Sequence, residues 1–138
     1  MADEIALELQ AALIASIRGS SELTDFLAGR AYATLPPVDK LAFPFAQIGP
    51  IEPRPLYSDC SRSERVIFSI EVISGSAGEG QVEVSRGAGL LKDLLDGNPL
   101  DLATHRMVSI NWKTQTYEHD ALAKRHSMLV VFSSVIDE

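Results

Sequence analysis

The sequence predicts an α+β fold: a four-stranded, mainly antiparallel sheet with two or three helices packed on one face. Apolar residues recur at helical spacing in some segments and alternate along strand-length segments in others. The order of these segments is helix, short helix, strand, strand, helix, strand, strand, which suits helices gathered on one face of a sheet. The 138 residues are typical of one domain, and no linker-like stretch divides them, so residues 1–138 are expected to form a single domain.

The first two elements are helices. The first has apolar residues every three or four positions, at Ile5, Leu9, Ala12, Leu13 and Ile17. Gly19 suits its end. Ser20 or Ser21 can cap a short second helix that ends at Gly29. The second helix carries Leu23, Phe26 and Leu27.

The middle of the chain predicts two strands separated by a loop. After a short extended piece at residues 30–33, residues 43–48 form a strand that begins with a proline. The three prolines between residues 50 and 63 predict a long, stiffened polar loop. Residues 65–74 alternate as a strand, with Ser69 and Glu71 on one face and Val66, Phe68, Ile70 and Val72 on the other.

The last part predicts a helix and a hairpin. Residues 79–96 carry one apolar stripe, formed by Val84, Ala88, Leu91 and Leu95. Residues 106–117 alternate, which would place Val108, Ile110 and Trp112 on one face. Residues 125–136 are apolar on both faces, so that strand should be central or covered by another element or another chain.

Composition excludes several classes of function. The net charge is −7, and no run of basic residues occurs, which disfavours nucleic-acid binding. The only cysteine, Cys60, excludes an internal disulfide and fits a reducing compartment. No apolar run approaches the ~18 residues of a membrane helix, and the acidic start is unlike a signal peptide. We therefore expect a soluble protein made in the cytoplasm, with no membrane partner.

No motif predicts a catalytic, cofactor or metal site. The Gly87-Ala88-Gly89 segment lacks the glycine spacing of a phosphate loop, and close helix packing is the favoured interpretation. The histidines are not spaced as metal ligands, although His119 and His126 flank the hairpin turn and could meet. The alternative hypothesis is a small α+β ligand-binding domain or enzyme, with its site near Cys60 and the three histidines, His105, His119 and His126. A generic dimeric interaction module is a third possibility.

Two short sequence motifs and the order of the helices and strands indicate a family resemblance. Gly29-Arg30-Ala31-Tyr32 is similar to a Gly-Arg-x-Tyr motif that follows the N-terminal helices of that family. Residues 43–49, Phe-Pro-Phe-Ala-Gln-Ile-Gly, are similar to its Phe-Pro-aromatic start of the first long strand. Over nearly its whole length the chain resembles the tail-completion, or tail-terminator, proteins of long-tailed phages. It is most similar to the branch found in phages and gene transfer agents, long filed as a domain of unknown function.

The resemblance implies a structural role without catalysis. Members of that family form a ring, commonly a hexamer, at the head-proximal end of the tail tube. The ring stops tube growth and joins the tail to the head connector, and DNA passes through it without specific binding. The expected partners are further copies of the chain, the tail-tube protein and the head–tail connector, and the expected location is the virion tail.

Candidate contact residues follow from loop position and strand exposure. In the segment between residues 50 and 63 they are Arg54, Tyr57 and Arg62. In the closing hairpin they are Trp112 and Tyr117, because aromatic residues are favoured in the centres of interfaces. Trp112 has a competing interpretation as a core residue, since it lies in register with Ile110.

Overall fold

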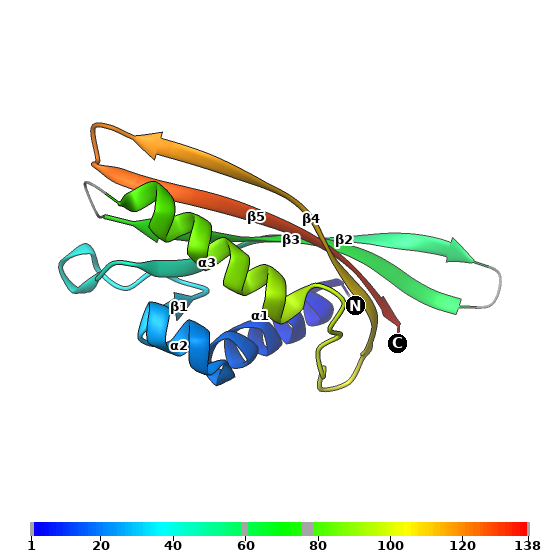
Figure 1. The fold of residues 1–138 in the computed structure, drawn as a ribbon. Helices are drawn as coiled ribbons and strands as arrows, with labels where there is room; N and C mark the ends of the chain where they lie inside the picture. Colours follow the sequence, from blue (N-terminus) through cyan, green and yellow to red (C-terminus); the bar gives the residue numbers. More distant parts are fainter. Residues whose placement is uncertain (1, 59–60, 76–78, 138) are drawn as a thin grey trace.

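The computed structural model describes residues 2–58, 61–75 and 79–137, and it is an α+β fold (Figure 1). The sheet has five strands in the order β1-β2-β3-β5-β4. The elements are α1 (Ala2–Gly19), α2 (Ser21–Leu27), β1 (Ala31–Tyr32), the short 3-10 helix η1 (Val38–Lys40), β2 (Phe45–Ser58), β3 (Ser61–Ser74), α3 (Gly80–Leu95), β4 (Arg106–Asp120) and β5 (Arg125–Asp137).

The prediction of four strands was wrong, because the short extended piece at residues 30–33 joins the sheet. Ala31 pairs with Ala46, and Tyr32 pairs with Gln47, in parallel. A strand of two residues is too short to show an alternating pattern, so its sequence carries no signal. All other pairings are antiparallel, which confirms the mainly antiparallel sheet.

The prediction of a loop between residues 50 and 63 was also wrong. β2 and β3 are 14 residues each and stay paired as far as Ser58 and Ser61. β1 covers the outer edge of β2 only at residues 46 and 47, so the rest of β2 is an edge strand. Pro53 and Pro55 lie two residues apart, and their missing N–H groups would both point to that free edge. Edge prolines are compatible with a strand and also discourage pairing with a foreign strand.

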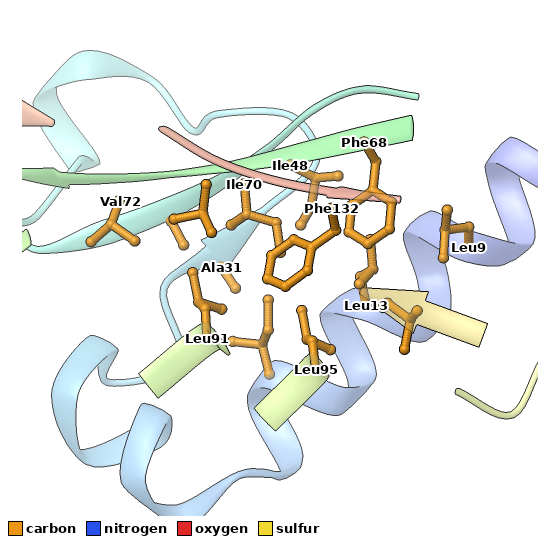
Figure 2. Packing of buried hydrophobic residues seen from close by; sticks show 14 of the residues in the cluster. Leu9, Leu13, Ala31, Ile48, Phe68, Ile70, Val72, Leu91, Leu95 and Phe132 are labelled. Carbon is orange, nitrogen blue, oxygen red and sulfur yellow. The ribbon is translucent and has the colours of Figure 1, made fainter. Parts of the chain in front are cut away.

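The helices all lie on one face of the sheet, and the hydrophobic core fills the space between (Figure 1). Figure 2 shows Leu9 and Leu13 of α1, together with Leu91 and Leu95 of α3, pointing toward the sheet. The rings of Phe68 and Phe132 stack there, with centroids 5.4 Å apart. Burial of one such side chain contributes about 1.5–3 kcal/mol.

Close packing explains two glycines of α3, Gly80 against the His126 ring and Gly87 against α2 and the sheet. A Cβ on Gly87 would lie 2.8 Å from both Phe26 of α2 and Val72 of β3. The packing interpretation is therefore confirmed for Gly87. A Cβ on Gly89 would have no neighbouring atom within 4 Å, so close packing does not require a glycine there.

The central position predicted for β5 is confirmed, whereas two register shifts interrupt the alternation predicted for β4. β5 lies between β3 and β4, as its apolar character predicted. In β4, the register shifts between Met107 and Ser109, which buries Met107 and leaves Val108 47% exposed. The extra residue of a bulge changes which side chains face the core, and simple alternation cannot show that.

Candidate interaction surface

The face of the sheet opposite the helices, here called the open face, is the principal candidate site. The even-numbered side chains are buried from Val66 to Ser74 on β3 and from Met128 to Ile136 on β5, on the side of the helices, so the odd-numbered ones point to the open face. Four of these are apolar and only partly covered, and they are called the apolar strip: Ile67, Leu129, Val131 and Val135. An exposed sheet face is normally polar. A partly covered apolar strip on it is typical of a contact surface.

A groove of about 600 Å³ lies at one end of the open face. Its apolar walls are Leu35, Phe45 and Ile73, and its polar lining includes Gln47, Glu71 and Glu118. Phe45 is fully buried because the rings of Phe43 and Tyr32 cover it, at 5.4 and 6.3 Å between centroids. A smaller hollow of about 250 Å³ continues the groove along the sheet past Glu71.

Two carboxylates give this groove a negative character. Burial raises the pKa of the half-buried Glu71 carboxyl, and the negative charge of Glu118 raises it further. Both effects mean that the ionised carboxylate of Glu71 lacks adequate compensation within the chain. A cation placed in the groove would relieve this.

The other end of the open face carries arginines. Arg54 of β2 and Arg65 of β3 are direct cross-strand partners, and both are exposed. Glu52 approaches Arg54 at 3.5 Å, but both side chains of this pair are more than half exposed, so its contribution is small. Arg65 makes no ion pair with any residue that the structure describes. This end therefore offers positive charge.

A third arginine at this end is neutralised. Arg106 donates to Asp137 at 2.9 Å, and Ser63 donates to the same carboxylate. The hydrogen bond from Ser63 and the contact with Arg106 together hold the pKa of the Asp137 carboxyl below its usual range. These contacts join β3, β4 and β5 where the sheet leaves its helical cover.

Comparison with known proteins assigns a family. Residues 11–137 match the family described as "Tail completion protein gp17". The chain belongs to this family. It is thus a structural protein of the phage-tail class, and the resemblance found in the sequence is confirmed. No curated protein matches the chain significantly.

Solved structures with this fold also exist. A chain of the solved "Virion of native gene transfer agent (GTA) particle" aligns with a TM-score of 0.87 and 23% identity, covering 96% of this chain and 97% of that one. A second solved structure aligns with a TM-score of 0.57 and 16% identity, covering 99% of this chain and 95% of that one. At these identities the likeness shows that the fold is shared.

The two sequence motifs that indicated the tail completion family contact each other in the structure. Arg30 donates to the carbonyl oxygens of Pro44 (2.9 Å) and Phe43 (3.0 Å), and the N–H of Ala46 donates to the carbonyl of Arg30 (2.9 Å). The Gly-Arg-x-Tyr motif thus holds the Phe-Pro-aromatic motif at the start of β2. This contact holds the wall of the groove in place.

The five candidate contact residues of this tail completion protein lie in two different environments. Arg54 is exposed at the positive end of the open face. Tyr57 and Arg62 pair across the β2–β3 hairpin, and their side chains lie outside the described residues. Trp112 and Tyr117 are half-buried and pack against the core. Arg54, Tyr57 and Arg62 therefore share the hairpin that projects beyond the helices (Figure 1).

Trp112 and Tyr117 are held by contacts within the chain. Asp96 accepts a hydrogen bond from the backbone N–H of Trp112 (2.8 Å), and the Lys92 ammonium lies 4.2 Å from the Trp112 ring centroid. The hydroxyl of Tyr117 lies 2.7 Å from Nδ1 of His126. Their role in contacts with a partner stays a prediction.

The residues of the enzyme alternative are only partly brought together. His119 and His126 stack across the hairpin, with ring centroids 4.3 Å apart, as the sequence suggested. His105 lies before the other end of β4 and contacts Glu8 of α1. Cys60 lies outside the described residues. Residues 2–58, 61–75 and 79–137 contain no cluster of three potential metal-ligating side chains and no helix long and apolar enough to cross a bilayer.

Proposed function

We propose that this chain, as one domain, is a tail terminator: a homo-oligomeric ring, commonly a hexamer in such proteins, at the head-proximal end of the tail tube. The ring stops tube growth and joins the tail to the head connector. Family membership supports a tail role. The main support for the ring is the open face, where the described residues leave the apolar strip only partly covered and Arg54 and Arg65 exposed.

The shape of the sheet suits a ring. A cap must close on itself through contacts between different surfaces of successive copies. The β2–β3 hairpin extends beyond the helices and could reach a neighbouring copy (Figure 1). Edge prolines at positions 53 and 55 disfavour strand addition along β2. Contacts made by the hairpin therefore depend on its side chains, with Arg54, Tyr57 and Arg62 as the leading candidates.

The turn between β4 and β5 is a second projecting contact. Asp120 accepts hydrogen bonds from the backbone N–H groups of Leu122 and Ala123, at 3.1 Å each. Leu122 is 98% exposed on this ordered turn. An apolar side chain presented to solvent on a hydrogen-bonded turn is suited to contact the tube or the connector, and Trp112 and Tyr117 brace the same hairpin.

DNA would pass through the ring without specific binding. The net charge of −7 gives the subunit a surface that repels phosphate. We propose that acidic side chains line the channel. An assembled-ring structure with those side chains on the outer wall would contradict this.

Tube polymerisation tests the terminator role. Purified tail-tube protein would be polymerised with increasing amounts of this chain, and tube lengths would be measured by electron microscopy. We expect shorter tubes, each with a ring at one end. A Val82→Ser variant is the control, because Val82 is exposed on α3 and away from the open face. Unchanged tube lengths with no ring at either end would contradict the role.

A further inference from the structure

The open face carries two pairs of like charges, one at each end. At the hairpin end, Arg54 and Arg65 lie directly opposite each other across β2 and β3. Like charges in a cross-strand pair destabilise a sheet. Glu52 relieves only one of the two arginines, through an exposed contact of 3.5 Å. The isolated subunit thus has an unfavourable positive pair on a surface that is available for contact.

The groove at the other end has the opposite imbalance. Glu71 and Glu118 line the same groove, and Glu71 is half-buried there. The other charged or titratable groups in the lining are His119, Asp120 and Arg125. The Arg125 guanidinium lies 5.2 Å from the Phe43 ring centroid. Burial raises the pKa of Glu71, and the negative charge of Glu118 adds to this effect.

We propose that Arg54 and Arg65 of one copy dock in the groove of the next copy, against Glu71 and Glu118. The groove of about 600 Å³ has room for an arginine side chain, and Leu35, Phe45 and Ile73 offer apolar walls for its methylene groups. A guanidinium can bind a carboxylate with two parallel hydrogen bonds. Each copy thereby neutralises the like-charge pair of its neighbour.

The occupant is a second copy of the chain because the same sheet face supplies both charges. Register places the apolar strip between the two ends: Val135 pairs with Arg65, and Leu129 pairs with Glu71. The two ends are six residues apart along β3, about 20 Å. If each copy offers its arginine end to one neighbour and its groove to another, the contact is head-to-tail, which is the kind that can close into a ring. The inference rests on the proposed function only in requiring that copies associate.

Charge exchange tests this contact. The first variant combines Arg54→Glu with Arg65→Glu, and the second combines Glu71→Gln with Glu118→Lys. Association would be measured by sedimentation velocity at low ionic strength, for each variant alone and for an equimolar mixture. Each variant alone should associate roughly tenfold or more weakly than the wild type, and the mixture should recover association. A control, Arg86→Glu, reverses the charge of an exposed residue of α3 and should associate as the wild type does.

The outcomes separate this contact from the terminator role. Variants that associate as strongly as the wild type, or a mixture that fails to recover, would overturn the contact while tube shortening could still support the role. Recovery in the mixture without any effect on tube length would support the contact and overturn the role. Circular dichroism of each variant confirms folding, and Glu118→Lys alone, at an exposed position, replaces the second variant if that variant is unfolded. A wild type that stays monomeric even at tube ends would overturn both.

Discussion

The two faces of the sheet use the same strands for different purposes. On β3 the side chains that face the helices, Val66, Phe68, Ile70 and Val72, are all buried. Between them, on the open face, lie Arg65, Ile67, Ser69 and Glu71, which are exposed or half-buried. Under the proposed function, alternate residues of this one strand serve stability and association. Neighbouring substitutions should therefore have different consequences.

The largest difference is expected between Phe68 and Ile67. Phe68→Ala removes a fully buried ring that stacks on Phe132, so it should lower the free energy of unfolding by about 3–5 kcal/mol. Ile67→Ala, the adjacent control on the open face, should cost less than half as much and should weaken association. Urea denaturation and sedimentation velocity measure the two effects. Equal losses of stability would contradict the division between the faces.

Arg30 tests whether the groove on the open face is held by a specific contact. Arg30→Ala removes the charged donor to the carbonyls of Phe43 and Pro44 and should lower the free energy of unfolding by about 1.5–3 kcal/mol. Arg30→Lys should recover little of the lost free energy of unfolding, because an ammonium cannot reproduce the planar, multiple-donor geometry of a guanidinium. Arg86→Ala, an exposed residue of α3, should stay within about 0.5 kcal/mol of the wild type. An Arg30→Ala variant as stable as this control would show that the hydrogen bonds of Arg30 do not hold the start of β2.

The helix-facing half of the molecule could be predicted from the sequence, because burial imposes a period on the residues. The apolar stripe of α3, including Leu91 and Leu95, and the inward side chains of β3 are all buried as expected. Helix boundaries were also close, since Ser20 caps α2 and Gly97, with φ of +75°, follows α3.

The open face could not be predicted as well, because pairing between distant segments defines it. Prolines at positions 53 and 55 indicated a loop, whereas the free edge of β2 permits them in a strand. The pairing of Arg54 with Arg65 depends on the register of that hairpin. Alternation predicts that Glu71 points away from the helices, but its proximity to Glu118 depends on β5 lying between their strands. Sequence spacing carries none of this.

Acid titration distinguishes a carboxylate on the helical side from one on the open face. Partial burial alone would raise the pKa of the Glu8 carboxyl, but hydrogen bonds from Thr104 and the contact with His105 outweigh it and lower the pKa. The folded-state pKa is then below the unfolded one. The ionised Glu8 carboxylate therefore stabilises the fold at pH values above its unfolded-state pKa, near 4.5. This stabilisation is lost as the pH falls through its folded-state pKa. Glu8→Gln should reduce stability at neutral pH and flatten this loss.

Glu71 should show the opposite sign. Burial and then Glu118 raise its pKa, so the ionised carboxylate destabilises the isolated subunit above the folded-state pKa. That penalty disappears as the pH falls below the unfolded value. Glu71→Gln should therefore raise the free energy of unfolding at neutral pH, by at most about 1 kcal/mol given its partial exposure, while weakening association. Urea denaturation of both variants between pH 3 and 7, a range of ~4 pH units around the carboxyl pKa values, measures the two slopes. A loss of stability in Glu71→Gln would contradict the sign.

The smallest effect on stability is expected at Leu122. Its side chain is 98% exposed, so Leu122→Ser removes almost no buried surface and should change the free energy of unfolding by less than about 0.5 kcal/mol. The turn should persist, because Asp120 binds the backbone of Leu122 rather than its side chain. If the turn contacts the tube or the connector, burial of this leucine contributes about 1.5–3 kcal/mol there, and the variant should need more than tenfold higher concentration to shorten tubes. Val82→Ser on α3 is the matched control, since it also removes an exposed apolar side chain. Equal tube shortening by both variants would place the contact elsewhere and leave the open face as the assembling surface.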